Sequence, residues 1–96
     1  MVNQAEVLEW VADRWPDYTE PIWRAVKVGE EAGEVLGAII KSQEGVGGKN
    51  ISDVAQETAQ LVLCAMALAE SCGFDLNAEI EAEWERCLVR VWVSEE

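Results

Sequence analysis

One segment of the chain, residues 51–72, combines helical length with an almost unbroken apolar composition in its second half. From Thr58 to Ala69 it is apolar nearly all round a helix, which is typical of a helix that is buried on most sides. Gly73 follows, and a glycine there predicts a C-cap. A chain of 96 residues leaves few others to cover this helix. We therefore expect a helical fold completed by association, as a homodimer or a dimer-of-dimers tetramer.

Turn signals divide the chain into four helical segments within a single domain, residues 1–96. They are expected at about residues 3–15, 19–42, 51–72 and 75–93. Pro16 ends the first segment, Pro21 stands where the second begins, and the glycine-rich stretch 43–50 separates the second from the third. No stretch alternates strongly enough between apolar and polar residues to predict a strand. The predicted fold class is all-α, a four-helix bundle.

Charge and the absence of histidine narrow the possible chemistry. Nineteen Asp and Glu residues against seven Lys and Arg give a net charge of −12, which argues against binding to a nucleic acid polymer. A phosphorylated substrate would need a metal ion or a local basic group to approach. Without histidine the chain has no Ser-His-Asp or Cys-His machinery and no HExxH zinc site. Any metal must be held by oxygen ligands, which favour Mg²⁺, Mn²⁺ or Ca²⁺.

The sequence also predicts a cytoplasmic protein that does not enter a membrane. Its longest apolar run, residues 61–69, is nine residues long, whereas a membrane span needs about 20. The stretch MVNQAEVLEW has no basic region and no apolar core, so we expect no signal peptide. The three cysteines are odd in number and form no CxxC pair, which favours a reducing compartment.

Three glutamates crowd the second segment. Glu30, Glu31 and Glu34 share one side of the helix, opposite an apolar side made of Val28, Ala32, Val35, Leu36, Ile39 and Ile40. Taken alone, this pattern is an amphipathic helix whose acidic face is exposed to solvent. Like charges at this spacing cost about 0.2–0.5 kcal/mol per pair, so either water screens them or a cation offsets their repulsion.

The third segment favours the second of these explanations, a bound cation. Glu57 and Gln60 lie one turn apart beside apolar side chains, where a carboxylate is costly unless it is paired or binds a metal. If the two helices are antiparallel, the pair Glu31 and Glu34 can meet the pair Glu57 and Gln60 across a cleft. Three carboxylates with water suit Mg²⁺, which also binds substrate phosphates.

At these residues the chain resembles the MazG-like, all-α nucleoside triphosphate pyrophosphohydrolases. That family carries EExxE on one helix and ExxD on the next. Residues 30–34 read EEAGE, with Lys27 before them, and residues 57–60 read ETAQ. The apolar run follows, and residues 73–76 read GFDL, which matches the turn that closes the family pattern. The resemblance covers about residues 20–92.

The resemblance implies Mg²⁺-dependent hydrolysis of a nucleoside triphosphate to the monophosphate and pyrophosphate, a reaction that cleans the nucleotide pool; Mn²⁺ is an alternative metal. It implies that Glu31, Glu34 and Glu57 are metal ligands together with the residue at position 60, and that Glu30 binds a second metal or orients the attacking water. Candidates for contacts to the substrate are Lys27, Lys49 and Arg90 at phosphates and Trp23 at the base.

The sequence departs from the family at Gln60, where the pattern has Asp. An amide oxygen can bind a metal but adds no negative charge. The chain could compensate with Glu30 or Asp53, or it could be a nucleotide- or metal-binding relic without turnover. A simple interaction module with an acidic surface is a further alternative. Phosphoribosyl-ATP pyrophosphohydrolase activity, on a similar scaffold, ranks below a general nucleotide substrate.

Overall fold

A computed structural model describes residues 2–90 of the chain, and every described regular element is helical. The four α-helices are α1 (Gln4–Arg14), α2 (Pro21–Glu44), α3 (Ile51–Cys72) and α4 (Leu76–Val89). Two 3₁₀ turns, η1 (Pro16–Tyr18) and η2 (Val46–Gly48), precede and follow α2. The described part contains no strand, so the all-α prediction is confirmed.

The helix ends lie close to where the sequence places them, because local signals determine them. The Asn50 side chain accepts a hydrogen bond from the backbone of Ser52, and the Asp53 carboxylate accepts one from the backbone of Asn50 at the start of α3. Gly73 ends α3 in the left-handed conformation, with φ of 81°, as predicted. The fourth helix ends at Val89, earlier than expected, and residues 91–93 of that prediction lie outside the described residues.

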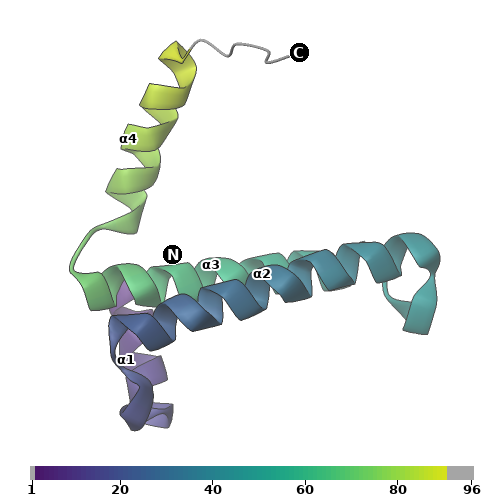
Figure 1. Cartoon of the computed structure of the whole chain (residues 1–96), viewed down its shortest axis with the longest axis horizontal. Helices are drawn as coiled ribbons and strands as arrows, with labels where there is room; N and C mark the ends of the chain where they lie inside the picture. Colours follow the sequence, from purple (N-terminus) through teal and green to yellow (C-terminus); the bar gives the residue numbers. More distant parts are fainter. Residues whose placement is uncertain (1, 91–96) are drawn as a thin grey trace.

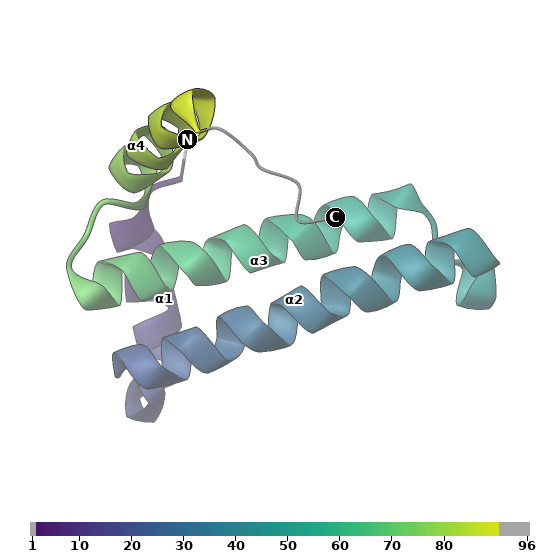
Figure 2. The same cartoon turned by 45° about the horizontal axis from the view of Figure 1, so that its top comes forward.

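The helices α2 and α3 form a long antiparallel pair, and the other two helices diverge from it. Both views show α2 and α3 side by side along their length, with α1 crossing the pair near the end where α2 begins (Figures 1 and 2). After a bend of 105°, α4 projects away from α3 (Figure 1). The Gln4 side chain ties α1 to this bend, since it donates to the carbonyl of Phe74 and accepts from the backbone of Leu76.

The arrangement leaves a very small core. Among the described residues, the buried apolar side chains are Ala38, Ala67 and Ala69, and no large side chain is fully buried. The radius of gyration is 16.2 Å, against about 12–13 Å for a compact chain of this length. The four helices are therefore present as predicted, but in this single chain they are not closed around a common core.

The face that α2 turns toward α3 differs from the simple amphipathic pattern. Its buried residues are Arg24, Glu31 and Ala38, spaced seven apart, so Glu31 lies on the inner side of the helix. Leu36, on the side that the apolar pattern assigned to the core, is 60% exposed. Glu31 therefore does not belong to a solvent-exposed acidic face, which was the alternative for this helix taken alone. The reason is that α2 carries apolar residues on both sides, and α3 covers only one of them.

No single helix in residues 2–90 has the length and apolar character needed to cross a membrane. Only α3 and α4 taken together pass that test of length and composition, across their 105° bend.

Candidate functional site

Three glutamates from two helices meet between α2 and α3. Glu31 and Glu34 are one turn apart on α2, and Glu57 comes from α3. One carboxylate oxygen from each residue lies within 4.8 Å of the other two. The structure therefore brings together the three carboxylates that the sequence predicted as metal ligands.

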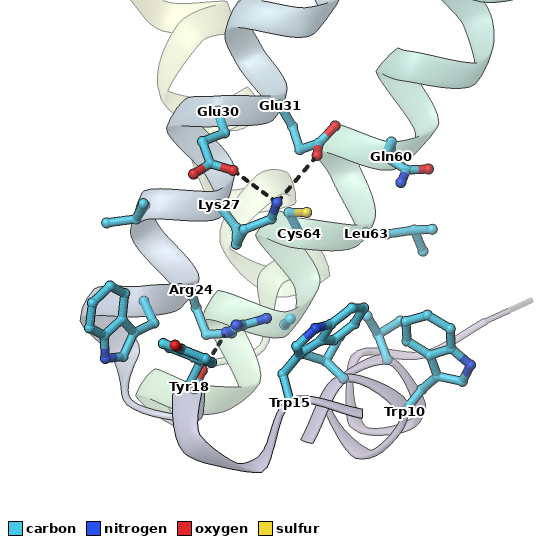
Figure 3. A pocket seen from close by; sticks show the side chains of 15 residues that line it. Trp10, Trp15, Tyr18, Arg24, Lys27, Glu30, Glu31, Gln60, Leu63 and Cys64 are labelled. Carbon is cyan, nitrogen blue, oxygen red and sulfur yellow. Dashed lines mark hydrogen bonds and ion pairs between the residues drawn. The ribbon is translucent and has the colours of Figure 1, made fainter. Parts of the chain in front are cut away.

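Glu31 is the most unusual member of this triad. The residue is only 7% exposed, and its Oε2 atom is buried without a hydrogen-bond partner among residues 2–90. Its other oxygen lies 3.8 Å from the Nζ atom of Lys27, which is a weak ion pair (Figure 3). A buried carboxylate oxygen without a partner carries a desolvation cost that a bound cation would offset.

The pKa of Glu57 is raised above its ordinary value. Partial burial of Glu57 is the main cause, and the negative charges of Glu34 and Glu31 act in the same direction. Lys49 acts weakly in the opposite direction. In the chain by itself, the neighbouring negative charges thus oppose the ionisation of Glu57.

The donor set and its spacing fit a hard divalent cation. Two oxygens on opposite sides of Mg²⁺ are about 4.2 Å apart, given bonds of about 2.1 Å. The triad oxygens lie within 4.8 Å of one another on flexible glutamate side chains, so small rotations bring them to ligand distance. All three donors are carboxylate oxygens, which suit Mg²⁺ or Mn²⁺.

Lys27 separates Glu30 from the triad. The Lys27 ammonium donates to Glu30 at 2.9 Å and faces Glu31 on its other side, as Figure 3 shows. The hydrogen bond to Glu30 is the main reason why the pKa of Lys27 is raised, so this lysine carries a full positive charge beside the site. Glu30 is half-exposed and is not one of the three clustered acids.

Gln60 lies on α3 one turn after Glu57 and lines a pocket next to the triad. Its side chain is near Glu31 in Figure 3, with the amide turned away from the Glu31 carboxylate. Asp53, the other suggested substitute, instead caps α3 and pairs with Lys49 at 3.9 Å. Neither Asp53 nor Glu30 joins the triad.

The pocket beside the triad has a volume of about 490 Å³, is lined mostly by apolar residues and includes four aromatic side chains. Trp10 and Trp15 form one edge-to-face pair, with ring centroids 5.9 Å apart, and Tyr18 and Trp23 form another at 5.2 Å. Lys27, Glu30 and Glu31 close one end of the pocket (Figure 3). The pocket therefore has an apolar part with flat aromatic walls, and a charged end next to carboxylates that could bind a metal ion.

Arg24 places a second cation in the pocket wall. It is 7% exposed, and its Nε atom donates to the Tyr18 carbonyl at 3.1 Å. This bond fixes the turn between α1 and α2 against α2. Sequence reasoning identified Trp23 but missed Arg24, Trp10, Trp15 and Tyr18 as pocket residues. The density of aromatic residues between positions 10 and 23 was the available signal.

Two predicted substrate contacts lie elsewhere. Lys49 stands before α3 and pairs with Asp53, and it does not line the pocket. Arg90 follows α4, which projects away from the α2–α3 pair, and contacts Glu83 at 3.2 Å (Figure 1). Among the described residues, Lys49 lies close enough to act on the pKa of Glu57, but neither cation lines the pocket.

Comparisons with protein-family models, curated proteins and solved structures give no match to this chain.

Proposed function

We propose that the chain is a MazG-like enzyme that hydrolyses a nucleoside triphosphate to the monophosphate and pyrophosphate in the presence of Mg²⁺ or Mn²⁺. The observation that carries this proposal is the buried, unpartnered oxygen of Glu31, which lies within a triad of carboxylates at the charged end of an aromatic pocket. The order and spacing of EEAGE and ETAQ support the same function.

Glu31, Glu34 and Glu57 would hold the cation. When bound, such an ion polarises phosphate oxygens and lowers the pKa of coordinated water. The overall reaction adds one water across the bond between the α-phosphorus and the oxygen that bridges to the β-phosphate. That bond breaks, the monophosphate keeps the hydroxyl oxygen, and pyrophosphate leaves.

The chain's own cations serve to admit a polyphosphate. A net charge of −12 repels such a ligand, whereas Lys27 and Arg24 give the pocket two cations that balance its two carboxylates, Glu30 and Glu31. Lys27 is held between Glu30 and Glu31, so it can exchange a carboxylate contact for a phosphate contact without a large movement. Glu30 then has a free carboxylate beside the reacting phosphate, which suits it to orient water.

The aromatic chamber fits a nucleobase. Its volume of about 490 Å³ lies within the usual range for small-ligand pockets, about 300–1,000 Å³. Trp10, Trp15, Tyr18 and Trp23 offer flat faces on which a base can stack. Stacking tolerates different bases, so the walls favour a nucleoside without selecting one base by themselves.

Gln60 supports a second candidate, a protein that binds a nucleotide or metal without turnover. Its amide stands where the family pattern has a carboxylate, and it brings no charge to a site that already has only three clustered acids. This alternative keeps the same fold and pocket and differs only in the chemical step.

Pyrophosphate release from a panel of canonical and modified nucleoside triphosphates, with and without Mg²⁺, tests the proposal. The enzyme predicts metal-dependent release that is lost in Glu34→Gln and retained in Glu44→Gln, a matched change at the exposed end of α2. Release only from Gln60→Asp would assign the native chain to the binding protein. If neither the native chain nor Gln60→Asp releases pyrophosphate, and neither binds Mg²⁺, both the enzyme and the binding protein are refuted.

A further inference from the structure

The outer side of α2 is an apolar surface that no other described element covers. Ile22, Val26, Leu36 and Ile40 are all exposed there, between 44% and 63%. The helix packs on α3 with its opposite side, where Arg24, Glu31 and Ala38 are buried. In Figure 2, α3 lies along one side of α2, and no other helix runs along its opposite side beyond the end where α2 begins.

These residues form a continuous seam with the spacing of a helix–helix contact. The α2 seam, as we call it, consists of Ile22, Val26, Gly29, Gly33, Leu36 and Ile40. Steps of four and three residues alternate from one end to the other, which keeps all six positions on one stripe of the helix. The seam contains no charged residue. A stripe of this kind is typical of a surface that packs against another helix.

The centre of the α2 seam consists of Gly29 and Gly33, and no contact or backbone conformation within the described chain requires glycine at either position. A Cβ atom added at Gly29 or Gly33 would meet no atom within 4 Å, and neither glycine has a positive φ. Glycine inside a helix is destabilising relative to alanine. No contact within the described chain accounts for that cost, whereas a close approach by a second helix would.

The order of residues along the seam is symmetric about position 31. Ile22 and Ile40 lie nine residues from that position, Val26 and Leu36 lie five, and Gly29 and Gly33 lie two. A two-fold contact requires such self-complementarity, because residue i meets residue j and residue j meets residue i. Two antiparallel copies of this helix would place large side chains against large ones and glycine against glycine.

The chain as a whole exposes more surface than a compact monomer, and the excess is large enough for a stable dimer. The chain exposes 7210 Å², whereas a compact monomer of 10.6 kDa exposes about 5,500 Å². The difference is comparable to the area of about 1,000 Å² or more that each subunit buries in an obligate dimer. Together with a core of three alanines, this area points to a second copy of the chain as the occupant.

We infer that the α2 seam packs antiparallel against the α2 seam of a second copy, around a two-fold axis near position 31. Ile22 then contacts Ile40 of the partner subunit, and Val26 contacts Leu36 of the partner subunit. Gly29 and Gly33 let the two helix backbones approach at the crossing point. Val26 also lines the aromatic pocket, so the partner subunit would form part of the pocket rim. This interface stands independently of the proposed catalysis.

Crosslinking tests the pairing directly. In a full chain whose three natural cysteines are replaced, Val26→Cys is prepared with a tag and Leu36→Cys without one. The inference predicts that mixing the two gives a disulfide-linked heterodimer, while each alone gives at least roughly tenfold less crosslinked product, since each thiol then faces a non-thiol residue. Crosslinking that is equal or greater between like positions, or absent in chains whose circular dichroism remains native, would overturn it.

The mass in solution provides the second test, with a matched control. Light scattering should give the native chain twice 10.6 kDa at micromolar concentration. Leu36→Glu places two charges per dimer in the contact and should weaken association by at least roughly 100-fold. Val89→Glu, at a position that is 80% exposed on α4, should leave association unchanged. A monomeric native chain, or a dimer that resists Leu36→Glu, would overturn the inference.

Discussion

The carboxylates of Glu31 and Glu57 face each other from two different helices, and each offers an oxygen within 4.8 Å of the other. These residues are 26 positions apart in the sequence and are brought together because α2 and α3 run antiparallel (Figure 2). Glu34 completes the group from the next turn of α2. The arrangement places three like charges at one point in the absence of a cation, and most of the predictions below follow from this.

Replacing Glu31 by Gln should stabilise the metal-free chain. The change removes a buried charge whose Oε2 atom has no partner, and it leaves Lys27 with its shorter contact to Glu30. We expect the free energy of unfolding to rise by about 1 kcal/mol in urea titrations with a chelator present. Glu30→Gln is the control, since it removes an exposed carboxylate that is already paired. A marked loss of stability in Glu31→Gln would contradict the account.

The pH dependence of stability should report the raised pKa of Glu57. Because the folded chain holds this proton more tightly than the unfolded chain, ionisation costs stability as the pH rises through the raised pKa. The cost is absent below the ordinary value of 4.5. Without metal, the native chain should therefore lose more stability than Glu57→Gln between about pH 4 and pH 7, as measured by thermal unfolding. Parallel curves for the two proteins would contradict the repulsion within the triad.

Adding a carboxylate at position 60 should tighten the site. Gln60 lies one turn after Glu57 on the same helix, so Gln60→Asp brings a fourth charge near the triad. We expect Mg²⁺ affinity to rise on the order of tenfold, as additional anionic ligands do at other oxygen sites. Gln60→Asn is the matched uncharged control and should show no gain. Equal affinities for the Asp and Asn variants in calorimetric titrations would place position 60 outside the site.

The aromatic chamber should account for much of the nucleotide affinity. Trp23→Ala removes one stacking wall and should weaken binding of a non-hydrolysable nucleotide analogue by about 1–3 kcal/mol. Trp84→Ala removes an exposed tryptophan of α4 that does not line the pocket, and it should have no effect. Fluorescence titration in the presence of Mg²⁺ measures both. An equal loss in both variants would show that the effect of Trp23 is not one of stacking.

The sequence predicted the helices well because local sequence signals determine where each helix begins and ends. The bounds of α3, Ile51–Cys72, depend on the capping residue Asn50 and on Gly73, which can be recognised without knowledge of the rest of the fold. The meeting of the Glu31–Glu34 pair with Glu57 was predictable for a related reason. Antiparallel helices joined by a short glycine-rich turn bring such pairs together.

Other features could not be predicted, because they depend on which elements of the fold pack against each face of a helix. Leu36 and Val28 are both apolar residues of α2, yet Leu36 is exposed and Val28 is half-buried. Periodicity alone cannot show that one apolar side has no partner within the chain. The aromatic pocket depends on the crossing of α1 and on the bond from Arg24 to the Tyr18 carbonyl, and neither follows from local spacing.

Direct titration of metal with the native chain tests the central claim, that Glu31, Glu34 and Glu57 form a divalent cation site. Mn²⁺ can be followed by electron paramagnetic resonance and displaced by Mg²⁺, in the native chain, in Glu34→Gln and in Glu44→Gln. The account predicts saturable binding at the triad, lost in Glu34→Gln and retained in Glu44→Gln. Absence of saturable binding, or binding of equal strength in all three proteins, would contradict it.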